Sequence, residues 1–94
     1  MEKLILRVGS HAHMEPTLIG GDEIACIKAD LETLKYYVGY MHYIELKNGL
    51  TAIRRVEDIG ESIKIKCDSG DNSQTIPKNY VQAIYRVIAS LRRY

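Results

Sequence analysis

The dipeptide Asn48-Gly49 is the feature that most restricts how this chain of 94 residues folds. It separates two runs rich in β-branched and aromatic side chains, residues 40–47 and 50–56. Asn and Gly both tolerate the positive φ of a type I′ turn, so this dipeptide between two such runs predicts a β-hairpin. We therefore expect two antiparallel strands joined by a type I′ turn.

Further short segments, separated by turn-forming residues, extend the all-β pattern. Residues 62–67 alternate between apolar and polar, with Ile63, Ile65 and Cys67 on one face. Residues 81–91 favour a strand because they are rich in β-branched side chains, although a helix of that length is also compatible. The remaining expectations are strands at residues 4–8 and 23–28, a helical turn or a loop at 31–37, and a polar loop at 68–74.

Size and charge exclude several classes of function. The length predicts one all-β domain over residues 1–94, without repeats or linkers. The net charge is +1, with acids and bases interspersed, so we expect no direct contact with nucleic acid. No run of about 18 apolar residues is present, which argues against a membrane span. Cys26 and Cys67 lie far apart, which fits free thiols in a cytoplasmic protein without metal or other cofactor.

Residues 13–22, HMEPTLIGGD, carry the clearest functional pattern. They resemble the active-site segment of LexA-type repressors and signal-peptidase-like serine peptidases, which reads Ser-Met-x-Pro-Thr followed by Gly-Asp. The matching residues are Met14, Pro16, Thr17, Gly21 and Asp22. Further along the chain, residues 53–56 stand in place of Val-Lys-Arg-Leu, and the last apolar segment ends in basic residues, as in that family. The resemblance implies a small, twisted, β-barrel-like fold with short helical turns.

The catalytic positions implied by the resemblance are both substituted. The family uses a serine nucleophile and a neutral lysine as its base, and here His13 and Arg54 occupy those places. Arginine keeps its proton at physiological pH and cannot act as a general base. The resemblance therefore implies a catalytically inactive member. A buried guanidinium needs a partner, so we expect Arg54 to pair with Glu15, with Asp22 or with backbone carbonyls.

The resemblance also implies how an inactive domain would be used. Members dimerise in part through the last strand, which makes Tyr85, Val87 and Ile88 the candidate residues of a homodimer interface. They also hold an extended peptide in a cleft, in a context of bacterial transcription regulation. We expect the DNA-binding domain to be absent from this chain. The implied cleft residues are His13, Met14, Glu15, Pro16, Thr17, Asp22 and Arg54.

Three other interpretations stay open. Ser10 lies three residues before His13 and could form a nucleophile–base pair, in a self-cleaving or peptide-hydrolysing enzyme. His11 and His13 could bind a metal with His42, Asp22 or Asp58, although histidines exposed in a loop explain the pattern more simply. The chain could also be a structural β-barrel protein unrelated to that family.

Overall fold

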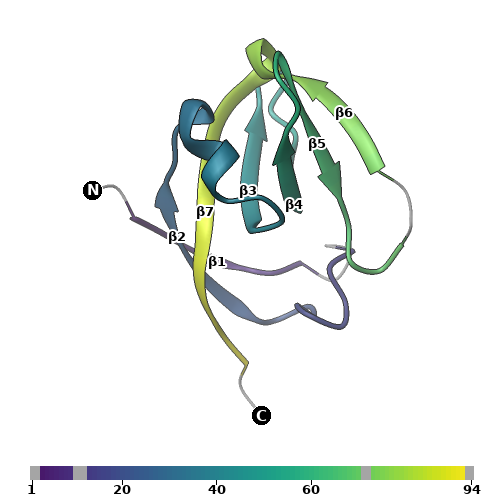
Figure 1. Ribbon diagram of the computed structural model, residues 1–94. Helices are drawn as coiled ribbons and strands as arrows, with labels where there is room; N and C mark the ends of the chain where they lie inside the picture. The colour runs from purple at the N-terminus through teal and green to yellow at the C-terminus, as the bar shows by residue number, and fades with distance from the viewer. Residues whose placement is uncertain (1–2, 10–12, 71–72, 93–94) are drawn as a thin grey trace.

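The computed structural model describes residues 3–9, 13–70 and 73–92. In these residues seven strands form one antiparallel sheet in the order β1-β2-β7-β3-β4-β5-β6 (Figure 1). The strands are β1 (Lys3–Arg7), β2 (Glu23–Lys28), β3 (Met41–Leu46), β4 (Thr51–Asp58), β5 (Ser62–Lys66), β6 (Ser73–Pro77) and β7 (Val81–Leu91); the short 3-10 helices are η1 (Leu31–Tyr36) and η2 (Lys78–Tyr80). The predicted all-β class is confirmed. The sheet is strongly curved but not closed, because β1 and β6 form its two edges.

The β3–β4 hairpin is present, but its turn differs from the prediction. Gly49 has a φ of 91°, whereas Asn48 is not in the positive-φ region. The amide of Gly49 donates to the Leu46 carbonyl at 2.9 Å, and the amide of Leu46 donates to the Leu50 carbonyl at 2.9 Å. This is a three-residue loop in which a type I turn precedes a left-handed glycine. The type I′ prediction is wrong because the Asn48 side chain accepts the Leu50 amide at 3.0 Å and so stabilises a different turn.

Strand β6 begins inside the predicted polar loop 68–74. Its residues pair with β5, Ser73 lying opposite Lys66 and Pro77 opposite Ser62. Most of its side chains are exposed. A polar edge strand shows no apolar alternation, so the sequence pattern could not separate it from a loop.

Strand β7 lies in the middle of the sheet, between β2 and β3. Two β-bulges interrupt its pairing, and each leaves one extra residue on β7: Gln82 opposite β3 and Ile88 opposite β2. Bulges bend a strand and increase its twist. They allow β7 to pair on one side with the β1–β2 part of the sheet, which crosses the lower half of Figure 1. On its other side β7 pairs with the β3–β6 part, which lies above.

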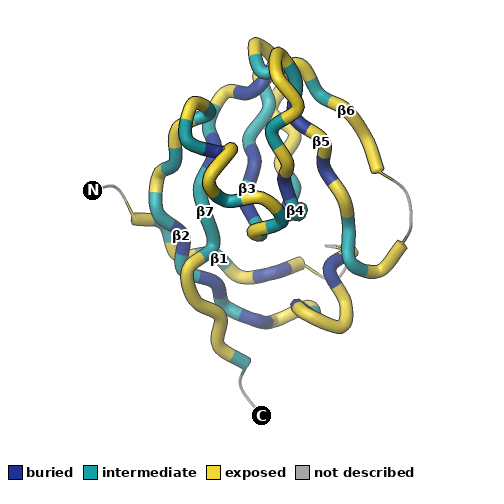
Figure 2. The backbone as a smooth tube through the Cα atoms, in the orientation of Figure 1, coloured by how far each residue is buried: buried dark blue, intermediate teal, exposed yellow. Residues whose placement is uncertain are grey.

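Two hydrophobic clusters lie on opposite faces of the central strands. Neighbouring residues of a strand point to opposite faces, and Ile84 belongs to the first cluster whereas Tyr85 packs against the second. Figure 2 shows the buried residues spaced along the central strands. The buried members of the first cluster are Leu34, Ile44, Val56, Ile63, Ile65, Val81 and Ile84. Those of the second are Val8, Met14, Leu18, Ile24, Cys26 and Ile53.

Among the described residues, no helix has the length and apolar character that a membrane crossing requires.

Candidate functional site

The segment that begins at His13 is anchored on both sides of its exposed residues. Met14 and Leu18 are buried in the second cluster, and the Leu18 amide donates to the Met14 carbonyl at 2.8 Å. Glu15 and Thr17 are exposed between these anchors. The two buried side chains hold the segment against the core, and this fixes the position of the neighbouring exposed residue, His13.

His13 has a φ of 61°, in the left-handed region that residues with a Cβ seldom adopt. Its carbonyl accepts a hydrogen bond from the Ser69 amide at 3.1 Å, in the loop after β5. Nearby, the Thr17 hydroxyl donates to the Asp68 carboxylate of the same loop. The segment after β1 is thereby joined to the segment after β5, although about fifty residues separate them in the sequence.

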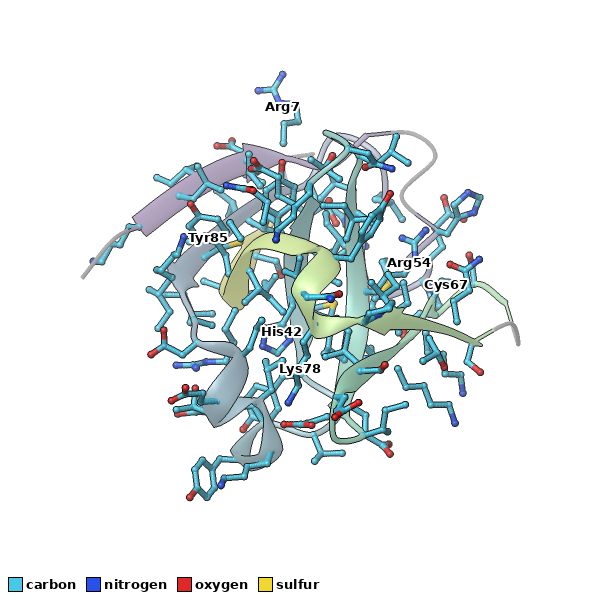
Figure 3. The ribbon with its side chains drawn as sticks, turned by 90° about the horizontal axis from the view of Figure 1, so that it is seen from above. Arg7, His42, Arg54, Cys67, Lys78 and Tyr85 are labelled. Atoms are coloured by element: carbon cyan, nitrogen blue, oxygen red, sulfur yellow. The ribbon has the colours of Figure 1, made fainter. Side chains whose placement is uncertain are left out.

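His13 and Arg54 line the same cavity, which has a volume of about 280 Å³. Ile65, Cys67 and Gln74 complete its described lining. Arg54 and Cys67 lie on the same side of the molecule in Figure 3, away from Tyr85. The structure therefore brings together the two positions that the resemblance links. Ser10 and His11 lie outside the described residues.

A second cavity, of about 240 Å³, adjoins the first. Arg54, Ile65 and Gln74 line both cavities, and we call the two cavities together the groove. The lining of the second cavity is mainly apolar and comes from β3, β4, β5, β6 and the turn before β4; besides Ile65 it includes Ile44, Leu46, Leu50, Ala52 and Ile76. The groove thus has a polar end at His13 and an apolar end at Ile76.

Arg54 stands at the junction of these two ends and is half-buried. Its guanidinium donates to the carbonyl of Ile53 at 2.7 Å, which confirms a backbone carbonyl among the partners expected for it. Its neighbour Arg55 faces the other side of the sheet, as strand alternation requires. There Arg55 forms two hydrogen bonds with Asp68, at 2.8 and 2.9 Å.

Asp22 is held by the other end of the chain and is not among the described residues that line the groove. It is only 3% exposed and accepts two hydrogen bonds from Arg92, at 3.0 and 3.1 Å, and a third from the Ile19 amide at 3.0 Å. The hydrogen bonds from Arg92 hold the pKa of Asp22 below its usual value. Asp22 therefore closes the turn before β2.

The other implied cleft residues also lie apart from the described lining of the groove. Met14 is fully buried, and Glu15, Pro16 and Thr17 are exposed on the turn that follows His13. Conversely, the groove contains Ile65, Cys67 and Gln74, which the sequence did not single out as functional. Strand register explains why Ile65 lies in the groove. Ile65 is opposite Val56 of β4, and Val56 is on the same face of the sheet as Arg54.

His42 is fully buried in β3, with Arg54 opposite it on β4 and Arg86 opposite it on β7. Its Nδ1 lies 2.8 Å from the Tyr40 carbonyl, which can only accept, so Nδ1 carries the proton. Its Nε2 has no hydrogen-bond partner among the described residues. Burial lowers the pKa of His42, and the charge of Arg86 acts in the same direction, so the ring stays neutral near neutral pH.

No group of three or more His, Cys, Asp or Glu side chains that would hold a metal is found in residues 3–9, 13–70 and 73–92. His42 makes its contact with Tyr40 inside the sheet, whereas His13 is exposed at the mouth of the groove. Within the described chain, these two histidines take up separate structural roles.

The three interface candidates on β7 differ in exposure. Tyr85 and Val87 are half-buried and pack against the second cluster, whereas Ile88, the bulged residue, is 51% exposed. In the described structure, pairing with β3 ends at Arg86, so β7 beyond that point pairs with β2 alone. A hollow of about 360 Å³, lined in part by Val38, Met41 and Val87, adjoins this free edge.

A larger hollow, of about 400 Å³, lies between the start of η1 and the start of β7. It is lined by residues 28–32 and 81–84 and contains no His or Cys in its described lining. It offers surface charges but no convergent chemical groups. The groove is the better candidate site because it joins a guanidinium, an imidazole and a thiol to an apolar pocket.

Comparison of the sequence with known proteins adds no assignment, since neither a family model nor a curated protein matches the chain.

Proposed function

We propose that this chain is a non-catalytic domain that binds an extended peptide segment in the groove. The observation that carries the proposal is that two cavities of different character share Arg54, Ile65 and Gln74 in their lining. One end of the groove has polar groups, which can orient a peptide by hydrogen bonds. The other end is an apolar pocket, in which burial of a peptide side chain is favourable.

The rim of the groove suits an extended ligand. Gln74 and Ile76 line the groove from β6, and β6 is an edge strand. In the described residues, its backbone pairs with β5 on one side only. A peptide that adds to this edge would gain main-chain hydrogen bonds, while its alternate side chains would enter the groove.

The chemistry of the lining favours binding over hydrolysis. Arg54 keeps its proton and cannot activate a nucleophile. A peptidase built on Ser10 and His13 stays a prediction, because Ser10 lies outside the described residues. The resemblance to LexA-type domains suggests a cytoplasmic, bacterial transcription regulator as the setting of this binding.

Selection from a random library of extended peptides, with the purified chain as bait, tests the proposal. Gln74→Trp is the blocking variant, because an exposed residue of an edge strand is replaced by a bulky one at the point where the cavities join. Thr75→Trp is the matched control, since Thr75 is also exposed but points to the opposite face. We expect selected peptides to lose at least about tenfold in affinity for the first variant only. Equal binding to both variants, or no selected peptide, would overturn the proposal.

A second candidate function is self-association through the last part of β7. The specific observation is that, within the described residues, β7 has no partner on its β3 side beyond Arg86, where Ile88 and Leu91 are both more than half exposed. An unpaired edge with apolar side chains is a ready surface for pairing with a second copy. Peptide binding and dimerisation use different parts of the sheet, so both can operate in one protein.

A further inference from the structure

We infer that the open edge of β1 is a second binding surface, which takes an acidic segment of another protein as an added antiparallel strand. The segment would carry an aliphatic residue opposite Ile5. It would carry an acidic residue two positions away on either side, opposite Lys3 and Arg7. In the described sheet β1 and β6 are the two opposite edges, so binding at β1 is independent of binding in the groove.

The backbone of β1 has hydrogen-bonding groups at this edge. Within the described sheet, β1 pairs with β2 alone and in antiparallel register. The ladder continues to Val8, whose amide donates to the Asp22 carbonyl at 2.7 Å. Alternate residues of an antiparallel strand bond the same neighbour, so the amide and carbonyl groups of Lys3, Ile5 and Arg7 point away from β2. A segment placed along the edge can form hydrogen bonds with all three.

The side chains of these three residues share one exposed face. Leu4 and Leu6, which lie between them, pack against the second cluster, so strand alternation turns the three to the opposite face. Ile5 is 73% exposed, more than any other large apolar side chain in the described part of the chain. Lys3 and Arg7 are also exposed, and Figure 3 shows Arg7 standing clear of the rest of the molecule. The edge thus presents an aliphatic side chain between two cations.

Charge complementarity selects the partner. Glu23 lies opposite Arg7 on β2, but within the described residues no ion pair involves Lys3 or Arg7. An acidic side chain directly opposite a basic one stabilises a pair of strands, as does a pair of apolar side chains. Two copies of this chain paired along β1 and centred on Ile5 would instead place Lys3 opposite Arg7, and opposed like charges are destabilising. The edge therefore favours an acidic partner over a second copy.

Three capped heptapeptides test this recognition on the complete chain, with binding followed by backbone chemical shifts of the isotope-labelled protein. The first is Thr-Glu-Thr-Val-Thr-Glu-Thr, in which both Glu lie on the same face as Val. The second replaces both Glu by Gln. The third, Thr-Thr-Glu-Val-Glu-Thr-Thr, has the composition and charge of the first but turns both Glu to the other face. We expect the first peptide to bind about fivefold more tightly than the others, because it alone forms both charged cross-strand pairs.

The double variant with Lys3→Gln and Arg7→Gln should abolish this preference. The matched control combines Lys64→Gln with Lys66→Gln, which removes two charges from exposed positions of β5, a strand paired on both sides. The control should retain the preference.

A change in the peptide itself tests the strand pairing without any protein variant. In the antiparallel arrangement, the Val amide of the first peptide donates to the Ile5 carbonyl, whereas the amide of the next Thr points away from β1. Methylation of the Val amide nitrogen should therefore weaken binding more than methylation of that Thr nitrogen. Equal effects would overturn pairing of the peptide as an added strand.

Four further outcomes would overturn the inference. Equal binding of the first and third peptides would show attraction by net charge without strand pairing. No binding of any peptide would mean that the cations only protect the edge from aggregation. Shift changes centred on Gln74 and Ile76 would place the peptide in the groove. Self-association that Ile5→Asp abolishes would assign the edge to a second copy of the chain.

Discussion

The guanidinium of Arg55 holds the carboxylate of Asp68 through two hydrogen bonds, of 2.8 and 2.9 Å. This pair connects β4 to the loop after β5, and Thr17 adds a third bond to the same carboxylate. The Ser69 amide of that loop donates to the His13 carbonyl, so the Arg55–Asp68 pair helps to position His13 at the groove.

Asp68→Asn should lower the free energy of unfolding by about 1 kcal/mol, since a bidentate charged contact at a partly exposed site is lost. Urea denaturation monitored by tyrosine fluorescence measures the change. Glu57→Gln, which removes a charge from an exposed position two residues after Arg55, is the control and should change stability by less. Equal losses in the two variants would show that net charge, and not this contact, is responsible.

His42 should make the protein less stable as the pH falls. Burial lowers the pKa of His42 from its ordinary value of 6.5. The unfolded chain therefore takes up a proton near pH 6.5, whereas the folded chain does so only at lower pH, and the free energy of unfolding decreases across this window. Asp22, Asp58 and Asp68, whose pKa values are lowered by hydrogen bonds from Arg92, Lys78 and Arg55, lose their contribution only below about pH 3.8.

Thermal melts of the protein and of His42→Leu between pH 8 and pH 5 test this prediction. The variant should lose the decline in stability near pH 6, whereas His13→Gln, at an exposed histidine, should retain it. An identical pH profile in His42→Leu would contradict the assignment of the effect to His42.

The two cysteines should differ sharply in reactivity. Cys26 is fully buried, and burial raises the pKa of its thiol to about 11. Cys67 is half-buried and lines the groove. Titration of the native protein with Ellman's reagent at pH 7.5 should therefore modify one thiol, because only an accessible thiol forms the reactive thiolate.

Cys67→Ser should abolish the fast reaction, and Cys26→Ala should leave it unchanged. Both thiols should react in denaturant. Rapid modification of Cys26 in the native protein would mean that the second cluster opens far more readily than its packing implies.

Self-association should depend on Ile88. Sedimentation equilibrium over a wide concentration range should reveal a dimer, and Ile88→Asp should dissociate it because a charge would enter an apolar contact. Ile59→Asp, at an exposed isoleucine in the turn between β4 and β5, is the matched control and should leave the dimer intact. A monomer at all concentrations would contradict the second candidate function.

The sequence predicts the elements whose apolar pattern is strong and local. Residues 23–28 and 81–91 match β2 and β7, because both segments are mainly apolar and contain β-branched residues, which favour strands. The polar strand β6 could not be recognised, since it is held by its ladder with β5 and not by its own side chains. The type of turn at Asn48 depends on one hydrogen bond, which the Leu50 amide donates to the Asn48 side chain. A pattern of residue types does not predict a single hydrogen bond of this kind.

The candidate site was predictable only in part. The resemblance to LexA-type domains links His13 with Arg54, and both line the groove. Cys67 and Gln74 join them through strand register, which the sequence alone does not provide. Asp22 pairs with Arg92, seventy positions away, and no local pattern connects these two residues.

Peptide binding in the groove is tested most directly by backbone chemical shifts of the isotope-labelled chain during titration with a peptide selected from the library of extended peptides. The largest changes should fall on five residues that line the groove from β4, β5, β6 and the loop after β5: Arg54, Ile65, Cys67, Gln74 and Ile76. Changes centred on Val87 and the hollow beside β3, or no changes at saturating peptide, would contradict peptide binding in the groove.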